Sequence, residues 1–264
     1  MITGAGRGIG KRLALGFGRL GARIALVGRS RGELEIAQIE IEQNGGSALR
    51  VEADVTDHEQ LRVAVDRLGV VFGGGPDLLI CAAAITGPLA AFSPATLKDW
   101  TRTMEVNMLG VVNACSAVLP SMIERGRGKI VILACGSDAV AMRNMSAYQT
   151  SKTALVRFAE CIAAELVDYN IQINCFDPGP TYTCLTDEVI HAESVLDPQV
   201  VEAAKETRST GGTSPELQMD HAIFLASEAS NHISGKLVQV TDDWKKLRNA
   251  HLRPDSLALR RVTK

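Results

Sequence analysis

Apolar residues gather in short, uninterrupted runs along much of the chain. Most of these runs are rich in branched side chains and lack the polar alternation of a half-exposed strand. Such runs are typical of parallel strands that are buried on both faces. The predicted strands are RIALVG (23–28), ALRVEADV (48–55), DLLICAA (77–83), KIVILAC (129–135), IQINCF (171–176) and KLVQVT (236–241).

Between the runs, apolar residues recur every three or four positions, as on one face of a helix. The clearest examples are Ile9, Leu13, Phe17 and Leu20, and later Leu155, Phe158, Ile162 and Leu166. The turns NGG (44–46) and GGGP (73–76) stop two such segments before the chain re-enters a strand. Alternating strands and helices require crossover connections. We therefore predict an α/β fold with a doubly wound, Rossmann-like parallel sheet between two helical layers, in one domain over residues 1–264.

This rhythm breaks near residues 181–213, which we expect to be irregular. Long connections in compact domains are often binding loops or lids. The segment contains the apolar residues Tyr182, Leu185 and Val189. It is therefore expected to be a partly apolar lid over a medium-sized organic substrate.

The start of the chain leaves no room for an expected strand. A glycine-rich phosphate loop normally follows a strand, yet only Met1 and Ile2 precede Thr3. The first strand of such a sheet is central, so its absence would leave its neighbours unpaired. We expect a truncated first strand, either because the chain is shortened or because its true start lies upstream.

Composition narrows the function classes. A net charge of -2 argues against general nucleic-acid binding, and the longest apolar run, IVILAC, is too short to span a bilayer. The six cysteines contain no C-x-x-C pair, so neither a metal site nor a disulfide framework is expected. We predict no metal, no membrane partner and a reducing, cytoplasmic location.

The C-terminal tail, residues 245–264, is basic, with seven Lys or Arg residues and one Asp. A solvated helix or a subunit contact explains such a tail better than phosphate binding does.

A candidate nucleotide site opens the first predicted helix. In TGAGRGIG (3–10), glycines let the backbone turn tightly and approach a pyrophosphate, whose charge a helix N-terminus favours. Glycine-rich turns also serve packing alone. The strand that follows at residues 23–28 strengthens the nucleotide interpretation.

The residues after that strand bear on the choice of cofactor. Dinucleotide sites often place an acid there for the ribose 2′-hydroxyl. This chain has Arg29 instead, and Arg7 lies in the loop itself. Guanidinium groups suit a 2′-phosphate, so NADP(H) is preferred and NAD(H) remains possible. The alternative is that both arginines are solvated surface residues.

The motifs in this order resemble the short-chain dehydrogenase/reductase family over nearly the whole chain. They are TGAGRGIG, ADV (53–55), VNMLG (106–110), YQTSK (148–152), INCFDPGPTYT (173–183) and FLASEASNHISGK (224–236). The resemblance implies a nicotinamide cofactor, a small-molecule alcohol or carbonyl substrate, and a homodimer or homotetramer.

It also implies roles for individual residues. Tyr148 would exchange a proton with the substrate oxygen; its ordinary pKa of about 10 requires assistance near neutrality. Lys152, one helical turn further, would favour the phenolate and hold the nicotinamide ribose. Asn107 would organise a water-linked proton path. The implied cofactor-binding residues are Thr3, Gly4, Arg7, Gly8, Ile9, Gly10, Arg29, Asp54, Val55, Ala82, Ala83, Lys152, Pro178, Gly179, Thr181 and Thr183.

The sequence departs from the family pattern in the active site. The serine expected thirteen residues before the tyrosine is Cys135, and a thiol is a much weaker hydrogen-bond donor than a hydroxyl. Cys135 either contacts the substrate or merely fills the strand end, and Ser137 is a possible substitute. The family's Asn-Asn-Ala-Gly after the fourth strand is here CAAA (81–84).

Two functions remain open on this pattern. The first is an NADP(H)-dependent oxidoreductase that interconverts an alcohol and a carbonyl, which the retained Y-x-x-x-K spacing favours. The second is a cofactor-binding sensor or subunit with little catalysis, which Cys135, CAAA and the missing strand favour.

Overall fold

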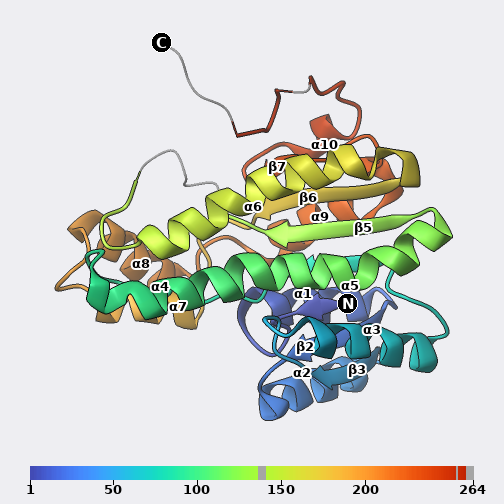
Figure 1. Cartoon of the computed structure of the whole chain (residues 1–264), viewed down its shortest axis with the longest axis horizontal. Coiled ribbons are helices and arrows are strands. Elements are labelled where there is room, and N and C mark those ends of the chain that lie inside the picture. The colour runs from blue at the N-terminus through green and yellow to red at the C-terminus, as the bar shows by residue number, and fades with distance from the viewer. Residues whose placement is uncertain (136–140, 254, 260–264) are drawn as a thin grey trace.

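A single parallel sheet organises the described part of the chain. The computed structural model describes residues 1–135, 141–253 and 255–259. Within them, seven strands form the order β3-β2-β1-β4-β5-β6-β7, and every pairing is parallel (Figure 1). The strands are β1 (Ile2–Thr3), β2 (Arg23–Gly28), β3 (Ser47–Glu52), β4 (Leu78–Cys81), β5 (Gly128–Leu133), β6 (Ile171–Asp177) and β7 (Leu237–Gln239). All six strands predicted from apolar runs are confirmed.

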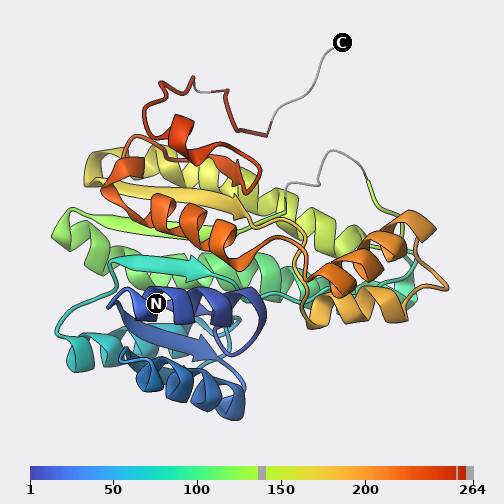
Figure 2. The ribbon, with the colours of Figure 1, turned by 180° about the vertical axis from the view of Figure 1, so that it is seen from behind.

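Helices cover both faces of the sheet. Helices α3, α5 and α6 lie on one face, and α1, α2 and α9 lie on the other (Figures 1 and 2). The helices are α1 (Gly8–Arg19), α2 (Arg31–Gln43), α3 (His58–Phe72), α4 (Leu97–Met104), α5 (Gly110–Arg125), α6 (Ser146–Glu165), α7 (Cys184–His191), α8 (Pro198–Thr210), α9 (Pro215–Ala226) and α10 (Trp244–Leu247). The doubly wound, three-layer prediction is confirmed.

The central strand β1 is short rather than missing. Ile2 pairs with Leu26 on one side and Ile80 on the other, so both neighbouring strands have a partner. The ladder extends one residue further, because Ile80 donates its backbone N–H to the Met1 carbonyl at 2.9 Å. The predicted truncated first strand is therefore confirmed as a two-residue strand, and both of its neighbours are paired with it. Two residues suffice because the strand is buried between two longer ones.

One other expectation needs correction. Residues 181–213 are not irregular, since α7 and α8 occupy most of them and lie beyond the carboxyl ends of the strands (Figure 1). The basic tail contains only the four-residue helix α10 in its described part. Beyond α10 the chain returns along the sheet edge, where Leu257 accepts a hydrogen bond from Leu237 at 2.8 Å.

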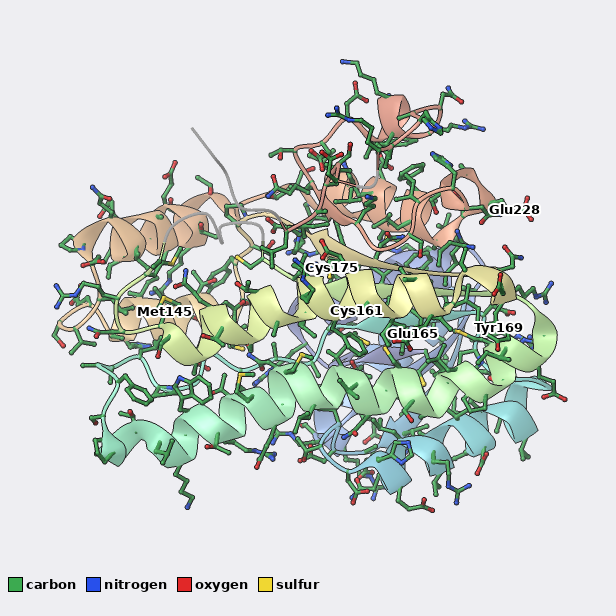
Figure 3. All side chains as sticks on the ribbon, turned by 45° about the horizontal axis from the view of Figure 1, so that its top comes forward. Met145, Cys161, Glu165, Tyr169, Cys175 and Glu228 are labelled. Atoms are coloured by element: carbon green, nitrogen blue, oxygen red, sulfur yellow. The ribbon has the colours of Figure 1, made fainter. Side chains whose placement is uncertain are left out.

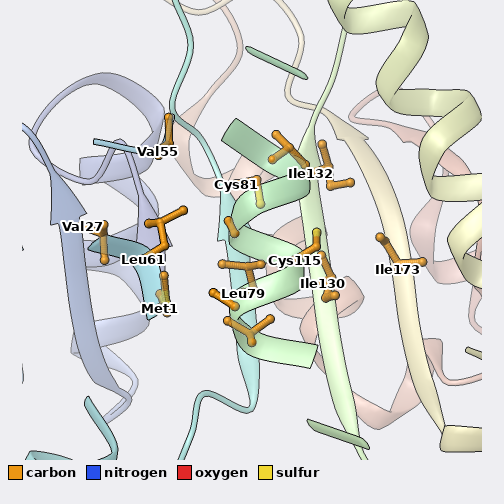
Figure 4. Packing of buried hydrophobic residues seen from close by; sticks show 14 of the residues in the cluster. Met1, Val27, Val55, Leu61, Leu79, Cys81, Cys115, Ile130, Ile132 and Ile173 are labelled. Carbon is orange, nitrogen blue, oxygen red and sulfur yellow. The ribbon is translucent and has the colours of Figure 1, made fainter. Parts of the chain in front are cut away.

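Two apolar layers hold the sheet between its helices. Figure 4 shows one of them, in which Leu79 of β4 and Ile130 and Ile132 of β5 pack beneath Cys115 of α5. On the other face, Leu26 and Phe176 are fully buried under α1 and α9. Inward side chains on both faces explain why the strand sequences are continuously apolar.

One continuous helical run among the described residues, Pro94–Arg125, is long and apolar enough by composition to cross a membrane, with a mean hydropathy of 1.6. Half of its most apolar window is buried inside the protein. Its α5 portion packs against β4, β5 and α3. Core helices of this kind meet the same length and composition criteria as membrane spans, so the run is explained by packing on the sheet.

Lys129 at the start of β5 provides a stability prediction. Burial lowers its pKa to about 8, although Glu228 acts in the opposite direction, and its Nζ donates to Ser230 Oγ at 3.2 Å. Because folding lowers this pKa, the charged lysine destabilises the native state at neutral pH. Lys129→Met should raise the free energy of unfolding at pH 7.

The difference in the free energy of unfolding between Lys129→Met and the wild type should shrink as pH rises from about 8 towards the ordinary lysine pKa of about 10.4. Chemical denaturation across this range measures the difference, and Lys98→Met on an exposed position of α4 is the control. A constant difference from pH 7 to pH 10 would contradict the explanation.

Candidate active site

A large cavity lies at the carboxyl ends of the strands, where doubly wound folds bind ligands. Its volume is about 530 Å³. Its walls come from the glycine-rich loop, the ends of β2 to β6, the start of α6, and α7 with α8. This one cavity therefore joins the candidate nucleotide site to the candidate catalytic residues.

The glycine-rich loop brings its backbone unusually close to the next strand. Gly4 has φ +64°, and a Cβ at this position would lie 2.7 Å from the backbone nitrogen of Ala83. A Cβ on Gly10 would collide with the Gly4 carbonyl oxygen. Only glycine fits both positions. Helix α1 begins at Gly8, so its free N–H groups face the cavity, and the loop fits the pyrophosphate of a dinucleotide.

Thr3 ties the centre of the sheet together behind this loop. Its Oγ1 accepts hydrogen bonds from the backbone N–H groups of Ala82 at 3.2 Å and Ala83 at 3.5 Å. This side chain thus anchors the segment in which the amides of the family pattern are missing. Ala84 is not one of the three described non-glycine residues with a positive φ, so its conformation does not require glycine.

The two arginines considered for cofactor choice line the far end of the cavity. Arg7 lies 3.7 Å from Glu33, and Arg29 lies 3.9 Å from Asp54. Both guanidinium side chains are more than half exposed. At these distances the ion pairs are loose, so either arginine can turn towards an anion in the cavity.

Asp54 is held as an anion by its neighbours. Burial would raise its pKa, but hydrogen bonds from the Thr56 backbone and hydroxyl, with the charges of Arg102 and Arg29, together lower it. Arg102 Nη2 lies 3.1 Å from Asp54 Oδ2. Asp54 is therefore already bonded to an arginine of α4, which leaves Arg29 the looser of its two partners.

Tyr148 and Lys152 lie one turn apart on α6 and both line the cavity. The Lys152 side chain is buried, and its Nζ donates to the Leu133 carbonyl at 2.8 Å. The same Nζ is 5.7 Å from the centroid of the Tyr148 ring. The cavity therefore holds an ammonium group beside the phenol ring.

Asn107 lies behind the cavity in a π-helical turn, Glu105–Leu109, between α4 and α5. Its Oδ1 accepts from the Ile85 N–H at 2.9 Å, and its Nδ2 donates to the Ile85 carbonyl at 2.9 Å. The same Nδ2 donates to Ser151 Oγ at 3.0 Å, and Ser151 is on the Tyr148 helix. Asn107 thus joins the segment after β4 to α6, and π-turns of this type are frequent at functional sites.

Cys135 follows β5 closely and lines the same cavity as Tyr148. Its thiol is partly exposed. Ser137, the other candidate donor, lies outside the described residues.

Most of the predicted site residues meet in this cavity, while Thr3 and Asn107 support it from behind. The residues that line it are Gly4, Arg7, Gly8, Ile9, Gly10, Arg29, Asp54, Val55, Ala82, Ala83, Cys135, Tyr148, Lys152, Pro178, Gly179, Thr181 and Thr183. Sequence reasoning missed Glu33, Thr86, Met145 and the α8 residues Val200 and Ala204. Pro198 at the first position of α8 and Gly211 after its end were available as signals for that helix.

The parallel sheet, the glycine-rich loop and the Tyr148–Lys152 pair define a nicotinamide-dependent oxidoreductase of the Rossmann-like class. The family model for short chain dehydrogenases matches residues 1–194. The chain therefore belongs to the short-chain dehydrogenase/reductase family, whose members act on alcohol or carbonyl substrates with nicotinamide cofactors.

Curated relatives resemble nearly the whole chain. It is 32% identical to 2,3-dihydro-2,3-dihydroxybenzoate dehydrogenase of Bacillus subtilis (strain 168), over 88% of this chain and 90% of the relative. It is 33% identical to gluconate 5-dehydrogenase of Gluconobacter oxydans (strain 621H), over 91% of each.

Solved structures agree with this assignment. NAD+-bound xylitol dehydrogenase superposes with a TM-score of 0.82 and 28% identity, over 90% of this chain and 95% of that one. Gluconate 5-dehydrogenase from Burkholderia cenocepacia J2315, in complex with NADP and tartrate, gives 0.77 and 30%, over 90% and 91%. These two structures contain different cofactors, so the resemblance alone does not choose between NAD and NADP.

Proposed function

We propose that this chain is an NADP(H)-dependent oxidoreductase that interconverts an alcohol and a carbonyl by hydride transfer. The observation that carries the proposal is the fixed Lys152 ammonium beside the Tyr148 ring, in the cavity that the glycine-rich loop opens. When bound, the nicotinamide supplies or accepts the hydride.

The chain's own residues position the reactants. The N–H groups at the start of α1 would hold the pyrophosphate, and Asp54 and Val55, which line the cavity, would contact the adenine. The segment with Pro178, Gly179, Thr181 and Thr183 follows β6, lines the cavity and would hold the nicotinamide. Lys152 would also hold the nicotinamide ribose, in addition to its effect on the neighbouring Tyr148.

Proton transfer falls to Tyr148. During carbonyl reduction its hydroxyl gives a proton to the substrate oxygen, and during alcohol oxidation the phenolate takes it back. Lys152 lowers the cost of the phenolate through its charge. Asn107, through Ser151 and Ile85, keeps the tyrosine helix in register with the segment after β4. The water-linked path implied for Asn107 remains a proposal.

Cys135 is proposed as the donor that polarises the substrate carbonyl, because it lines the cavity where the family has serine. A thiol is a weak donor, so the reaction should run with reduced stabilisation of the developing oxyanion. Ser137 is the alternative donor on sequence grounds.

NADP(H) preference is proposed on Arg7 and Arg29, which line the cavity in loose ion pairs. Arg29→Ala should lower the affinity for NADPH relative to NADH about tenfold, because a hydrogen bond between charged groups is lost. Fluorescence titration with both cofactors measures the ratio.

Arg31→Ala is the matched control for Arg29→Ala. Arg31 is a neighbouring exposed arginine that pairs with Glu52 at 3.8 Å and is not part of the described cavity wall. If Arg29→Ala and Arg31→Ala have equal ratios of NADPH to NADH affinity, Arg29 does not contact the cofactor.

The remaining assignments are also proposals. We propose one NAD(P)-binding domain over residues 1–264, with a lid over 181–213 and a tail over 245–264. We also propose that the protein acts in the cytoplasm on a small-molecule substrate, as a homodimer or homotetramer.

The test of the function is NADPH consumption with a broad panel of aldehydes and ketones. Consumption that depends on the carbonyl supports the proposal, and none across the panel contradicts it.

A further inference from the structure

The described wall of the cavity has two parts of different chemistry. Its charged members come from the glycine-rich loop, the ends of β2, β3 and β6, and the starts of α2 and α6; they are Arg7, Arg29, Glu33, Asp54, Lys152 and Asp177. Arg7, Arg29 and Asp54 belong to the part assigned to the cofactor, and Lys152 to the Tyr148–Lys152 pair. Glu33 lies beside Arg7, and Asp177 directly precedes Pro178. The lid part of the wall, by contrast, contributes none of them.

The lid part of the wall is mainly apolar. Its apolar side chains come from the segment before α6 and from α7 and α8, and they are Met145, Leu185, Val189, Val200, Ala203 and Ala204. The polar lining residues of α7 and α8, Cys184, Thr186 and Thr207, are all uncharged. A substrate that reaches Tyr148 from the lid therefore meets methyl and methylene groups.

This apolar wall is the surface of a third hydrophobic cluster. Met145, Leu196 and Val201 form its buried centre, and the Tyr148 ring and Val189 pack against it. Figure 3 labels Met145 at the end of α6 that lies beside α7 and α8. Because buried packing fixes Met145, the wall beside Tyr148 is set before any substrate binds.

Five charged side chains of residues 181–213 are paired, and only one of their partners, Thr86, lines the cavity. Lys205 pairs with Glu193 at 2.9 Å, and Arg208 lies 3.7 Å from Asp187. Glu188 accepts a hydrogen bond from the Thr86 hydroxyl. None of these five charged residues lines the described cavity.

The remaining cations near the site do not change this conclusion. Lys152 is committed to the Leu133 carbonyl and lies beside the Tyr148 ring. Arg143 is exposed and is not part of the described wall. Residues 136–140, which the structure does not describe, have the sequence GSDAV and so contain no lysine, arginine or histidine.

A substrate anion would therefore lose hydration in this part without gaining a positively charged partner from the described wall. Burying an unpaired carboxylate is far costlier than burying a polar neutral group, whereas each buried methylene group is favourable. We propose that the substrate is an uncharged, mainly apolar, medium-sized ketone or secondary alcohol, and that carboxylate-bearing analogues are rejected. The inference rests on the proposed function for the position of the reacting carbonyl beside Tyr148.

The test compares two cyclohexanones of similar size, one with an ethyl group and one with a carboxylate opposite the carbonyl. Calorimetric titration into the NADP+-loaded protein measures binding, and NADPH consumption measures turnover. We expect the neutral ketone to bind at least about 100-fold more tightly than the anion, as expected when a charge is desolvated without a partner.

Two neighbouring substitutions on α8 sharpen the comparison. Ala203→Arg adds a guanidinium group at an exposed position that lines the cavity. Because the carboxylate then has a partner, the affinity ratio of the neutral ketone to the anionic ketone should fall about tenfold. Glu202→Arg changes the net charge even more, but Glu202 is exposed and outside the described wall. The wild-type preference should persist in Glu202→Arg, which separates a local contact from a general charge effect.

The outcomes separate the two proposals. If the neutral ketone binds preferentially but no carbonyl of the panel is reduced, the proposed activity fails, while the preference of this wall for neutral ligands stands. If the anion binds as tightly as the neutral ketone, or neither binds, the inference is overturned whether or not other carbonyls are reduced. If Ala203→Arg and Glu202→Arg change the affinity ratio of the two ketones equally, the part of the wall that includes Ala203 does not contact the substrate.

Discussion

Replacing Tyr148 with phenylalanine is expected to reduce turnover by about 10²–10⁴ while leaving NADPH affinity nearly unchanged. The substitution removes only the hydroxyl that exchanges a proton with the substrate oxygen. The ring remains, so its packing against the cluster of Met145, Leu196 and Val201 is preserved. Steady-state kinetics with a carbonyl that the wild type reduces, together with cofactor titration, would measure both quantities.

Tyr182→Phe is the matched control for this substitution. Its hydroxyl donates to Asp187 at 3.0 Å on the lid, and Tyr182 is not part of the described cavity wall. Its removal should leave turnover within a few-fold of the wild type. A Tyr148→Phe enzyme that retains most of its rate would place the proton donor elsewhere.

Cys135→Ser is expected to accelerate the reaction. Removing a preorganised donor to a developing oxyanion typically costs about 10²–10³ in rate, and the thiol retains part of that function. Restoring a hydroxyl should therefore raise kcat by about tenfold or more, with a smaller effect on KM. The comparison requires kcat and KM for the same carbonyl in both proteins.

Cys184→Ser controls for the general effect of exchanging a thiol in this cavity, because Cys184 also lines it but lies on α7. It should not accelerate the reaction. If Cys135→Ser is slower than the wild type, Cys135 is better suited to its substrate than serine, and the donor assignment must be revised.

The sheet could be predicted from the sequence because its strands are buried on both faces. That environment requires continuous apolar runs, and each of the six predicted runs is a strand. The first strand could not be judged by the same criterion. Ile2–Thr3 is too short to produce a pattern, and only its pairing with β2 and β4 defines it.

Residues 181–213 were expected to be irregular, yet they contain the helices α7 and α8. Residues 181–213 are polar in many positions because α8 is largely exposed and α7 is only partly buried, so the apolar pattern of a helix is weak there. The ends of α8 nevertheless carry local sequence signals, because Pro198 is at its first position and Gly211 follows its last residue. Weighing these end signals above periodicity would have found the helix.

The candidate site was predictable where its chemistry is local in sequence. The spacing of Tyr148 and Lys152 places both on one face of α6, and the glycine-rich loop precedes α1 directly. Pairs that depend on tertiary structure were not predictable. Thr86 meets Glu188, and Asp54 meets Arg102, only because the sheet order brings distant segments together.

The most direct test of hydride transfer uses NADPH that carries deuterium at the transferred position. The protein is incubated with this cofactor and a carbonyl from the panel, and the alcohol product is analysed by mass spectrometry. The account predicts deuterium on the former carbonyl carbon in the wild type, with a large loss in Tyr148→Phe. NADPH that binds but transfers no deuterium to any carbonyl would contradict the account and favour a cofactor-binding role.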